Sequence, residues 1–378
     1  MTPISNETEQ PARRSWWKRL LQSVDWSTVA LVLAMKVLLL LFALQSLAAL
    51  WNEHLPPQEM WNRWDAPHYL NIAEHGYRNT EEHGFLLVFF PLYPWLIRLA
   101  AAITRNYFAA AILVSTFASV AAGLLLQRLA RMDWSPAVAR QAVWFFFIFP
   151  TSYFLHIGYT ESLFLALSIG CFLAARTGHW TWVGVLGAGA CLTRINGLLL
   201  VLPAAIEAWQ QYRATRRINL RWHSIAAMPC GFAVYLWLNY RITGNWLAFL
   251  QIQKENFFKE LMWPWVSILD LWSRIPEENA MTGVQEFAYV VLGLACTVWS
   301  WFRLRTSYAV WITLNWLLIT STSFVLSVPR YTLVLFPMFF LFARAGASRQ
   351  LWFAMISVWS LLFLALFVSR YVQGPWAF

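Results

Sequence analysis

The sequence predicts an all-α polytopic membrane protein, and three features of its composition carry that prediction. Hydrophobic residues make up 59% of the 378 residues and charged residues only 12%, which excludes an ordinary water-soluble domain. Apolar runs close to the roughly 20 residues that a helix needs to cross the hydrocarbon recur along nearly the whole chain. The 25 Trp and 13 Tyr residues suit a protein with many membrane–water boundaries, where amphipathic rings settle.

The charges and the cysteines exclude two other classes of protein. The net charge of +10 does not indicate a nucleic-acid partner, because the basic residues occur in short clusters between apolar segments, as in cytoplasmic loops that face anionic lipid. Each cysteine lies within an apolar segment and none has CxxC spacing, so we interpret all four as small core residues. They are Cys171, Cys191, Cys230 and Cys296.

The chain begins with a polar segment, residues 1–26, which ends in a basic cluster before the first apolar run. No site of small residues follows a short apolar core, so we expect an uncleaved anchor with a cytoplasmic N-terminus. The first span is predicted over residues 27–50. It delivers a first outer loop, residues 51–104, to the extracytoplasmic side.

The second apolar run, residues 85–104, is interrupted by Pro91 and Pro94. If this run crossed the membrane, the basic cluster that follows the next span, residues 108–126, would lie outside. We therefore predict that residues 85–104 form an interfacial or re-entrant helix within the first outer loop. The cluster that decides between these topologies consists of Arg128, Arg131 and Arg140.

Residues 180–209 start on the cytoplasmic side and are expected to return to it. The basic cluster that follows them belongs on that side by the positive-inside rule and consists of Arg213, Arg216, Arg217 and Arg221. We expect two short helices that meet at Arg194-Ile195-Asn196-Gly197. Non-helical backbone at such a point is tolerated only where it lines a cavity.

The remaining spans bring the predicted total to about 11, with residues 27–378 forming one membrane-embedded domain. A second outer loop, residues 243–282, is expected to be helical and partly interfacial. Pro329-Arg330-Tyr331 falls at the outer end of a tight helical hairpin. The further spans are predicted over residues 141–154, 162–175, 225–240, 284–302, 307–327, 331–345 and 350–370.

On this topology a set of ionisable residues gathers on the outer side of the membrane. Ionisable groups at membrane depth are costly and usually face a cavity or a partner. We therefore predict an active site here, with the carboxylate of Asp65 at its centre. The set consists of Asp65, His68, Glu161, Arg194 and Arg330.

Asp65 also has a structural interpretation. Asp65-Ala66-Pro67-His68 can open a helix with Asp65 as N-cap, ended by Gly76. Capping does not exclude catalysis, because the N–H groups of a helix start favour the ionised carboxylate that a general base requires. His68 lies within reach on the same side of that helix, and Tyr69 and Ile72 are expected to bury it against the bundle.

The other charged residues leave alternatives open. Arg194 either forms a salt bridge with Glu161 or recognises an anionic head group, for which a guanidinium is well shaped. Arg330 has the same two interpretations, the structural one being that it snorkels to the interface. Thr160 can be a simple helix N-cap. The histidines His54, His68, His75 and His83 show no compact ligand spacing, so we expect no cofactor, and a divalent-metal site is the alternative.

Five motifs resemble the PIG-V family, whose eukaryotic members add the second mannose to the GPI-anchor precursor. They occur in the family's order between about residue 60 and residue 331. They are Trp64-Asp65-Ala66-Pro67-His68-Tyr69 with Ile72-Ala73 and Gly76-Tyr77, Phe89-Phe90-Pro91-Leu92-Tyr93-Pro94, Tyr159-Thr160-Glu161-Ser162-Leu163-Phe164, Arg194-Ile195-Asn196-Gly197 and Pro329-Arg330-Tyr331.

The resemblance implies a GT-C-type glycosyltransferase with an extracytoplasmic active site and an interfacial helix in the first outer loop. Such enzymes take sugar from a polyprenyl- or dolichyl-phosphate donor and invert the anomeric configuration. Their acidic catalytic residue in the first outer loop corresponds to Asp65 here. The chain is shorter than expected of the eukaryotic enzymes, so it resembles a bacterial relative in the plasma membrane.

We therefore expect transfer of a hexose, with mannose implied by the family, from a polyprenyl-phosphate-linked donor to a lipid or glycan acceptor. Asp65 would act as the general base, with His68 and Glu161 orienting the acceptor or the base. The residues expected to hold the donor phosphate are Arg194, Arg330 and Tyr331. Those expected to contact substrate are Trp64, Tyr69, Tyr159, Glu161 and Asn196. The alternative is a lipid or small-molecule transporter or flippase. Transporters usually consist of two similar halves, and no later part of this sequence resembles the first outer loop.

Overall fold

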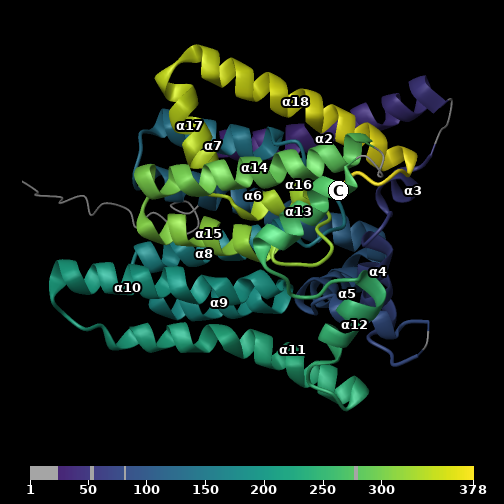
Figure 1. Cartoon of the computed structure of the whole chain (residues 1–378), viewed down its shortest axis with the longest axis horizontal. Coiled ribbons are helices and arrows are strands. Elements are labelled where there is room, and N and C mark those ends of the chain that lie inside the picture. The colour runs from purple at the N-terminus through teal and green to yellow at the C-terminus, as the bar shows by residue number, and fades with distance from the viewer. Residues whose placement is uncertain (1–23, 52–54, 81, 276–279) are drawn as a thin grey trace, which may run out of the picture.

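The computed structural model describes residues 24–51, 55–80, 82–275 and 280–378, which form a bundle of helices (Figure 1). The first half contains α2 (Trp26–Trp51), α3 (Pro57–Trp61), α4 (Ala66–His75), η1 (Gly84–Val88), α5 (Leu92–Thr104), α6 (Tyr107–Arg131), α7 (Pro136–Ile148), η2 (Ser152–Leu155), α8 (Glu161–Arg176), α9 (Trp180–Thr193) and η3 (Ile195–Leu200), where η marks 3₁₀ helices.

The second half contains α10 (Val201–Thr215), η4 (Leu220–Ala227), α11 (Met228–Thr243), α12 (Ala248–Phe257), α13 (Pro264–Arg274), α14 (Ala280–Arg303), α15 (Thr306–Thr320), α16 (Val328–Tyr331), η5 (Thr332–Val334), α17 (Met338–Ser348) and α18 (Gln350–Gln373). The two segments predicted as outer loops, residues 51–104 and 243–282, both carry helices. Their place outside the membrane stays a prediction. His54 and residues 276–279 lie outside the described residues.

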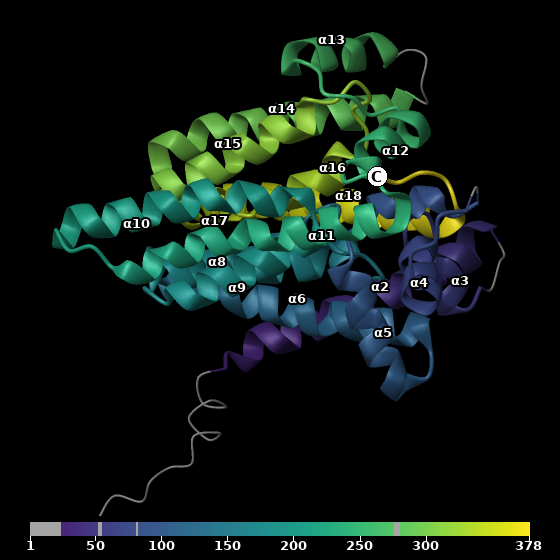
Figure 2. The same cartoon turned by 90° about the horizontal axis from the view of Figure 1, so that it is seen from below.

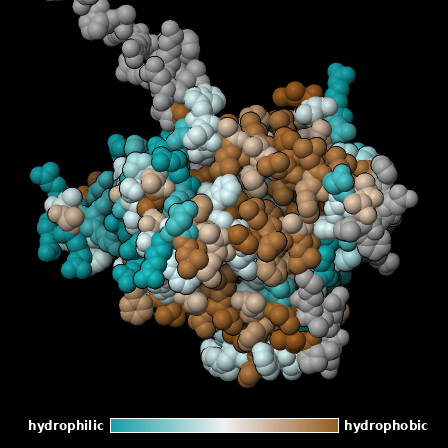
Figure 3. Space-filling view, turned by 90° about the horizontal axis from the view of Figure 1, so that it is seen from above, coloured by the Kyte–Doolittle hydropathy of each residue, from teal (hydrophilic) through white to brown (hydrophobic). Residues whose placement is uncertain are grey.

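The helices confirm an all-α membrane protein. In the described part of the chain, α2, α6, α14 and α18 are each long and apolar enough to cross a membrane, and α16–η5 with α17 adds a fifth if this pair, bent by 84°, counts as one span. Figure 3 shows a broad hydrophobic zone next to a hydrophilic end, as a bilayer requires. The total of about 11 spans stays a prediction.

Two element boundaries differ from the sequence-based expectation. The helix predicted over residues 141–154 ends at Ile148, because Pro150 lacks an N–H and disfavours helical backbone at the residue before it. The expected tight hairpin around Pro329-Arg330-Tyr331 is wrong. α15 ends at Thr320, and a non-helical link leads to Ser327, whose left-handed φ of 68° precedes the short α16.

The segment from α9 to α10 doubles back as the sequence predicts. α9 and α10 run in opposite directions in Figure 1, and the 3₁₀ helix η3 joins them. Gly197 lies in η3 directly against α9, where an added Cβ would meet the backbone nitrogen of Cys191 at 2.3 Å. Only glycine permits this close approach. The fold thereby places Arg194, at the junction, next to the N-terminus of α8.

Ion pairs join the helix ends at the basic end of the bundle. Arg131 at the end of α6 donates to Asp25 before α2, with 2.6 Å between Nη2 and Oδ2. Arg305 before α15 donates to Glu207 of α10, with 3.1 Å between Nη2 and Oε2. The basic clusters that the topology assigned to one side therefore lie at one end, on the left of Figure 1, and α4, α5 and α12 lie at the other.

Residues 66–104 of the predicted first outer loop pack together at that other end. Figures 1 and 2 show α5 running across the direction of the long helices, beside α4. Tyr69 and Ile72 of α4 are buried against Tyr93 and Ile97 of α5, as expected for this face of the helix. Of the cysteines, Cys171, Cys191 and Cys296 are buried, but Cys230 is exposed on α11, so the core interpretation is wrong for that residue.

Candidate active site

Asp65 occupies the N-cap position of α4, but its side chain does not cap the helix. Two local features explain the failure of the capping interpretation. Pro67 removes one of the two N–H groups that an N-cap side chain normally accepts from, and the N–H of His68 is bonded to the Asp65 carbonyl oxygen at 3.1 Å. The carboxylate instead accepts a hydrogen bond from Arg330, with 2.6 Å between Nη1 and Oδ2.

Arg330 bridges two carboxylates in the interior of the protein. Its Nη1 donates to Asp65, and its Nε donates to Oε1 of Glu161 at 2.5 Å. The guanidinium lies over the rings of Phe154 and Tyr159, at 4.8 and 4.6 Å from their centroids. Because the residue is only 4% exposed, the snorkelling interpretation is wrong.

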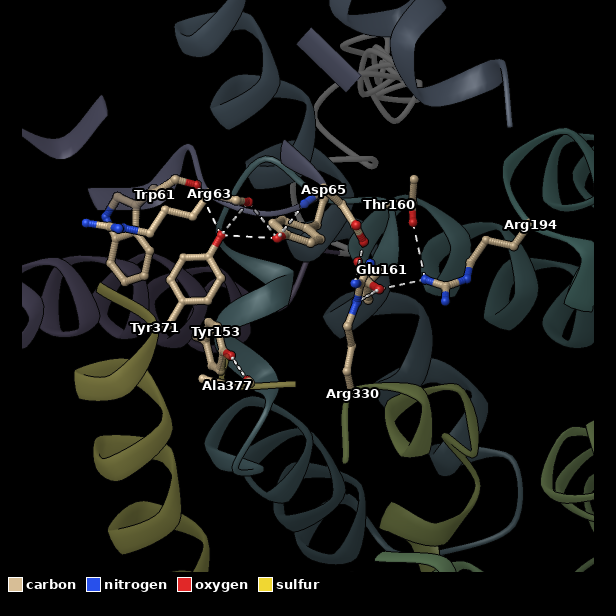
Figure 4. A network of polar contacts seen from close by, with 11 residues as sticks. Trp61, Arg63, Asp65, Tyr153, Thr160, Glu161, Arg194, Arg330, Tyr371 and Ala377 are labelled. Atoms are coloured by element: carbon tan, nitrogen blue, oxygen red, sulfur yellow. Dashed lines mark hydrogen bonds and ion pairs between the residues drawn. The ribbon is translucent and has the colours of Figure 1, made fainter. Parts of the chain in front are cut away.

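Arg194 approaches Glu161 from the opposite side (Figure 4). Its Nη1 donates to Oε1 of Glu161 at 2.6 Å and to the hydroxyl of Thr160 at 3.2 Å. The expected salt bridge is thus confirmed, and Thr160 does not cap α8 with its side chain. Two guanidinium groups and two carboxylates form one charge-balanced cluster, which we call the charged cluster: Asp65, Glu161, Arg194 and Arg330.

The members of the charged cluster differ in their access to a ligand. The Asp65 side chain is 27% exposed, whereas those of Glu161 and Arg330 are 1% and 5% exposed. Arg194 is intermediate at 13%. A substrate can therefore reach Asp65 and one edge of Arg194. Glu161 and Arg330 are buried behind these two residues and position them by hydrogen bonds.

Tyrosine hydroxyl groups fix the backbone that carries Asp65. Tyr159 donates to the carbonyl oxygen of Arg63 at 2.8 Å, and its hydroxyl accepts from the backbone N–H of Asp65 at 3.3 Å. Tyr371 of α18 lies 3.2 Å from the Tyr159 hydroxyl. Tyr159 is 1% exposed, which makes it a positioning residue in this geometry. No pattern in the sequence pointed to Tyr371.

Glu286 of α14 is a second residue that the sequence analysis missed. Its buried carboxylate accepts the backbone N–H groups of Ser327 and Val328, both at 2.7 Å. These bonds hold the left-handed turn at Ser327, two residues before Pro329 and three before Arg330. A carboxylate inside an apolar span was a usable signal, because such groups need a partner.

The remaining predicted site residues fall around this centre. Three cations lie near the Tyr331 ring, with Arg194 and Lys259 each 5.3 Å and Arg330 5.9 Å from its centroid. Asn196 donates to the side chain of Asn315 at 2.8 Å, which ties η3 to α15. Trp64 packs edge-on against Trp376, with 4.7 Å between ring centroids.

His68 is not bonded to Asp65 in the described part of the molecule. Its ring packs against Phe85 and Phe89, with centroids 5.1 and 5.2 Å away. Burial lowers the pKa of His68 below its usual value, and the nearby Asp65 charge opposes the shift only in part, so the imidazole is neutral at pH 7. Within the described ranges, no group of three or more His, Cys, Asp or Glu side chains is placed to hold a metal ion.

The fold belongs to a known class of membrane protein. The crystal structure of ArnT from Cupriavidus metallidurans bound to undecaprenyl phosphate is similar over 91% of this chain and 78% of that one, with a TM-score of 0.55 at 13% identity. At this identity the similarity defines the fold alone. That fold is of the GT-C type, an all-helical membrane architecture.

A sequence model of one family matches more than half of the chain. The mannosyltransferase (PIG-V) model covers residues 23–232, and this protein belongs to that family. The matched region contains Asp65, Glu161 and Arg194, whereas Arg330 lies beyond it.

Two curated relatives support the assignment. GPI alpha-1,6-mannosyltransferase 2 of Rattus norvegicus is 33% identical over 151 residues, which is 37% of this chain and 30% of the relative. GPI mannosyltransferase 2 of Yarrowia lipolytica is 30% identical over 142 residues, which is 37% of this chain and 38% of the relative. The matches thus span about a third of the length of these relatives.

The cluster geometry predicts that the two arginines differ in their effect on stability. Arg330→Gln leaves Glu161 with one partner and Asp65 with none, whereas Arg194→Gln leaves Glu161 paired with Arg330. Breaking a buried pair costs about 3–5 kcal/mol, so Arg330→Gln should lower the thermal unfolding midpoint of the detergent-solubilised protein far more than Arg194→Gln. Intrinsic tryptophan fluorescence follows the transition. Equal midpoints for the two variants would contradict the bridging role of Arg330.

Proposed function

We propose that this protein is an inverting membrane glycosyltransferase that moves a hexose, mannose in the first instance, from a polyprenyl-phosphate-linked donor to a lipid or glycan acceptor. The observation that carries the proposal is the position of Asp65. Its carboxylate is the most exposed member of the charged cluster, in a protein of the PIG-V family. Family membership also favours transfer over the alternative of a transporter or flippase.

Asp65 is suited to act as the general base. Arg330 binds its Oδ2, while Oδ1 accepts no hydrogen bond from the described residues. In the proposed reaction the acceptor hydroxyl attacks the anomeric carbon and passes its proton to Oδ1. The bond from that carbon to the phosphate oxygen breaks, and the lipid phosphate leaves with the bonding electrons. Attack from the face opposite the leaving group inverts the anomeric configuration.

Binding of the donor phosphate requires net positive charge, and the charged cluster has no net charge. Its two carboxylates balance its two guanidinium groups, and Arg330 is already bonded to both Asp65 and Glu161. Lys259 provides a further cation beside Tyr331, with its Nζ 5.3 Å from the ring centroid. We therefore assign the donor phosphate to Arg194, Lys259 and the Tyr331 hydroxyl, and give Arg330 the role of holding Asp65.

Backbone pairing holds Lys259 in place. The second outer loop forms a short antiparallel contact with the link before α16, in which Ser323 donates its N–H to the carbonyl oxygen of Glu260 at 2.9 Å. The N–H of Met262 donates to the carbonyl oxygen of Ser321 at 3.1 Å. This contact brings the loop that carries Lys259 beside Tyr331 of α16. Shielding of that place from water would strengthen electrostatic stabilisation of the leaving phosphate.

The distribution of charge supports an extracytoplasmic site. The end of α10 and the start of α15, which carry Arg213 and Arg305, lie at the opposite end of the bundle from α4 (Figure 1). Applied to this arrangement, the positive-inside rule makes the site extracytoplasmic and the N-terminus cytoplasmic. The bacterial origin and the acceptor remain sequence-based expectations.

Asp65→Asn should nearly abolish transfer while the protein still folds. The amide cannot take the acceptor proton, and general-base assistance is worth about 100- to 10,000-fold in rate. Turnover is measured with purified protein, polyprenyl-phosphate-mannose and a panel of lipid acceptors. Asp270→Asn is the matched control, because among the described residues Asp270 forms its ion pair with Arg274, in the second outer loop. Normal turnover by Asp65→Asn would refute the assignment of the base.

Lys259→Met should reduce kcat/KM for the donor by about 10- to 100-fold, which is the loss expected for one charge-assisted hydrogen bond to phosphate. Arg194→Ala should weaken donor binding in the same assay. Lys254→Met is the control, because Lys254 lies in the same loop, is exposed and pairs with Glu260 at 2.7 Å. If Lys259→Met and Lys254→Met behave alike, Lys259 does not contact the donor.

A further inference from the structure

A cavity of about 120 Å³ lies between α2, α3, α6 and η2. This volume accommodates several water molecules or one phosphate-sized group. The cavity is separate from the charged cluster. Its lining residue Trp61 stacks on Tyr371, and its lining residue Tyr153 packs on Phe154, with ring centroids 5.9 and 4.3 Å apart. Phe154 in turn supports Arg330, so a layer of aromatic rings divides the two sites.

Lys36 places a charge in this cavity without a counter-ion. It is the sole charged residue of the 26-residue helix α2. Its Nζ donates one hydrogen bond, to the carbonyl oxygen of His156 at 2.8 Å, and no described carboxylate forms an ion pair with it. An ammonium group within an apolar span is costly, so it generally serves a pathway or a ligand.

His156 adds unsatisfied polar atoms beside the same cavity. Its side chain is buried, and neither ring nitrogen has a hydrogen-bond partner in the described part of the protein. Buried polar groups without partners each cost about 1–3 kcal/mol. Neither Lys36 nor His156 has a part in the charged cluster, so the proposed transfer reaction does not account for them.

The rest of the wall is apolar and borders the lipid-facing side of the bundle. Leu40, Phe108 and Ile112 line the cavity and are partly exposed. Val37 and Leu41, next to Lys36 and Leu40 on α2, are 55% and 57% exposed, as side chains in contact with lipid would be. A hydrocarbon chain can therefore reach this wall from the membrane.

We propose that this cavity binds the phosphate group of a membrane lipid, with the Lys36 ammonium as its counter-ion and the lipid chain along α2 and α6. The uncompensated charge selects an anion, and the apolar wall selects an anion that carries a hydrocarbon chain. A prenyl monophosphate and an anionic glycerophospholipid share this chemistry. The inference stands apart from the proposed transferase function, because it concerns a second site and its own ligand.

Native mass spectrometry of the detergent-solubilised protein tests the proposal by counting bound lipids. The probes are farnesyl phosphate, dioctanoyl phosphatidylglycerol and inorganic phosphate. We expect Lys36→Met to lose one bound equivalent of one lipid probe, or to bind it at least tenfold more weakly, and Lys36→Arg to retain it. Whichever lipid is lost identifies the source. Lys254→Met is the matched control and should bind like the unmodified protein.

Two results would overturn the proposal. One is that Lys36→Met binds both lipids as the unmodified protein does. The other is that Lys36-dependent binding occurs with inorganic phosphate alone and with neither lipid. The stoichiometry also separates the two proposals. If the Lys36-dependent lipid is farnesyl phosphate and the charged cluster holds no donor phosphate, the unmodified protein binds one equivalent of it and Lys36→Met binds none. If the Lys36-dependent lipid is dioctanoyl phosphatidylglycerol, the count of bound farnesyl phosphate reports on the charged cluster alone.

Discussion

The bridge from Arg330 to Asp65 and Glu161 is the interaction on which the rest of the site depends. It joins the first outer loop, the start of α8 and the short helix α16, which are far apart in the sequence. A guanidinium this deeply buried is tolerated because its hydrogen bonds and the rings of Phe154 and Tyr159 replace its hydration. Glu286 positions Arg330 for these bonds, because its carboxylate accepts the N–H groups of the turn before α16.

Cations that are paired with carboxylates can be distinguished from cations that are free to bind a ligand. Within the charged cluster the positive and negative groups cancel, so the cluster is stable without a ligand. Lys259 and Lys36 lie outside this balance, one over Tyr331 and one in the cavity beside α2. Each lacks a carboxylate partner among the described residues, and each lies where a lipid phosphate could approach. The need of an unpaired cation for an anionic partner thus supports both the assignment of Lys259 to the donor phosphate and the second lipid site at Lys36.

The gathering of Asp65, Glu161 and Arg194 with Arg330 could be predicted from the sequence, because ionisable groups in an apolar chain must find one another. Expectations based on local sequence, such as helix capping and a tight hairpin, failed where tertiary contacts determine the conformation. The Asp65 carboxylate binds a buried guanidinium instead of capping its helix, and the link after Thr320 replaces a tight hairpin because Ser327 is held by Glu286. Lys259 was missed because its position depends on pairing between two distant loops, which no periodic pattern encodes.

The most direct test of the central claim is a cryo-EM structure of the protein with a non-hydrolysable polyprenyl-phosphonate analogue of the sugar donor. The account predicts the phosphonate within hydrogen-bond distance of Arg194 and Lys259, the anomeric carbon between it and Asp65, and the Arg330 bridge intact. A phosphonate bound directly to Arg330 with Asp65 displaced, or located away from the charged cluster, would contradict it.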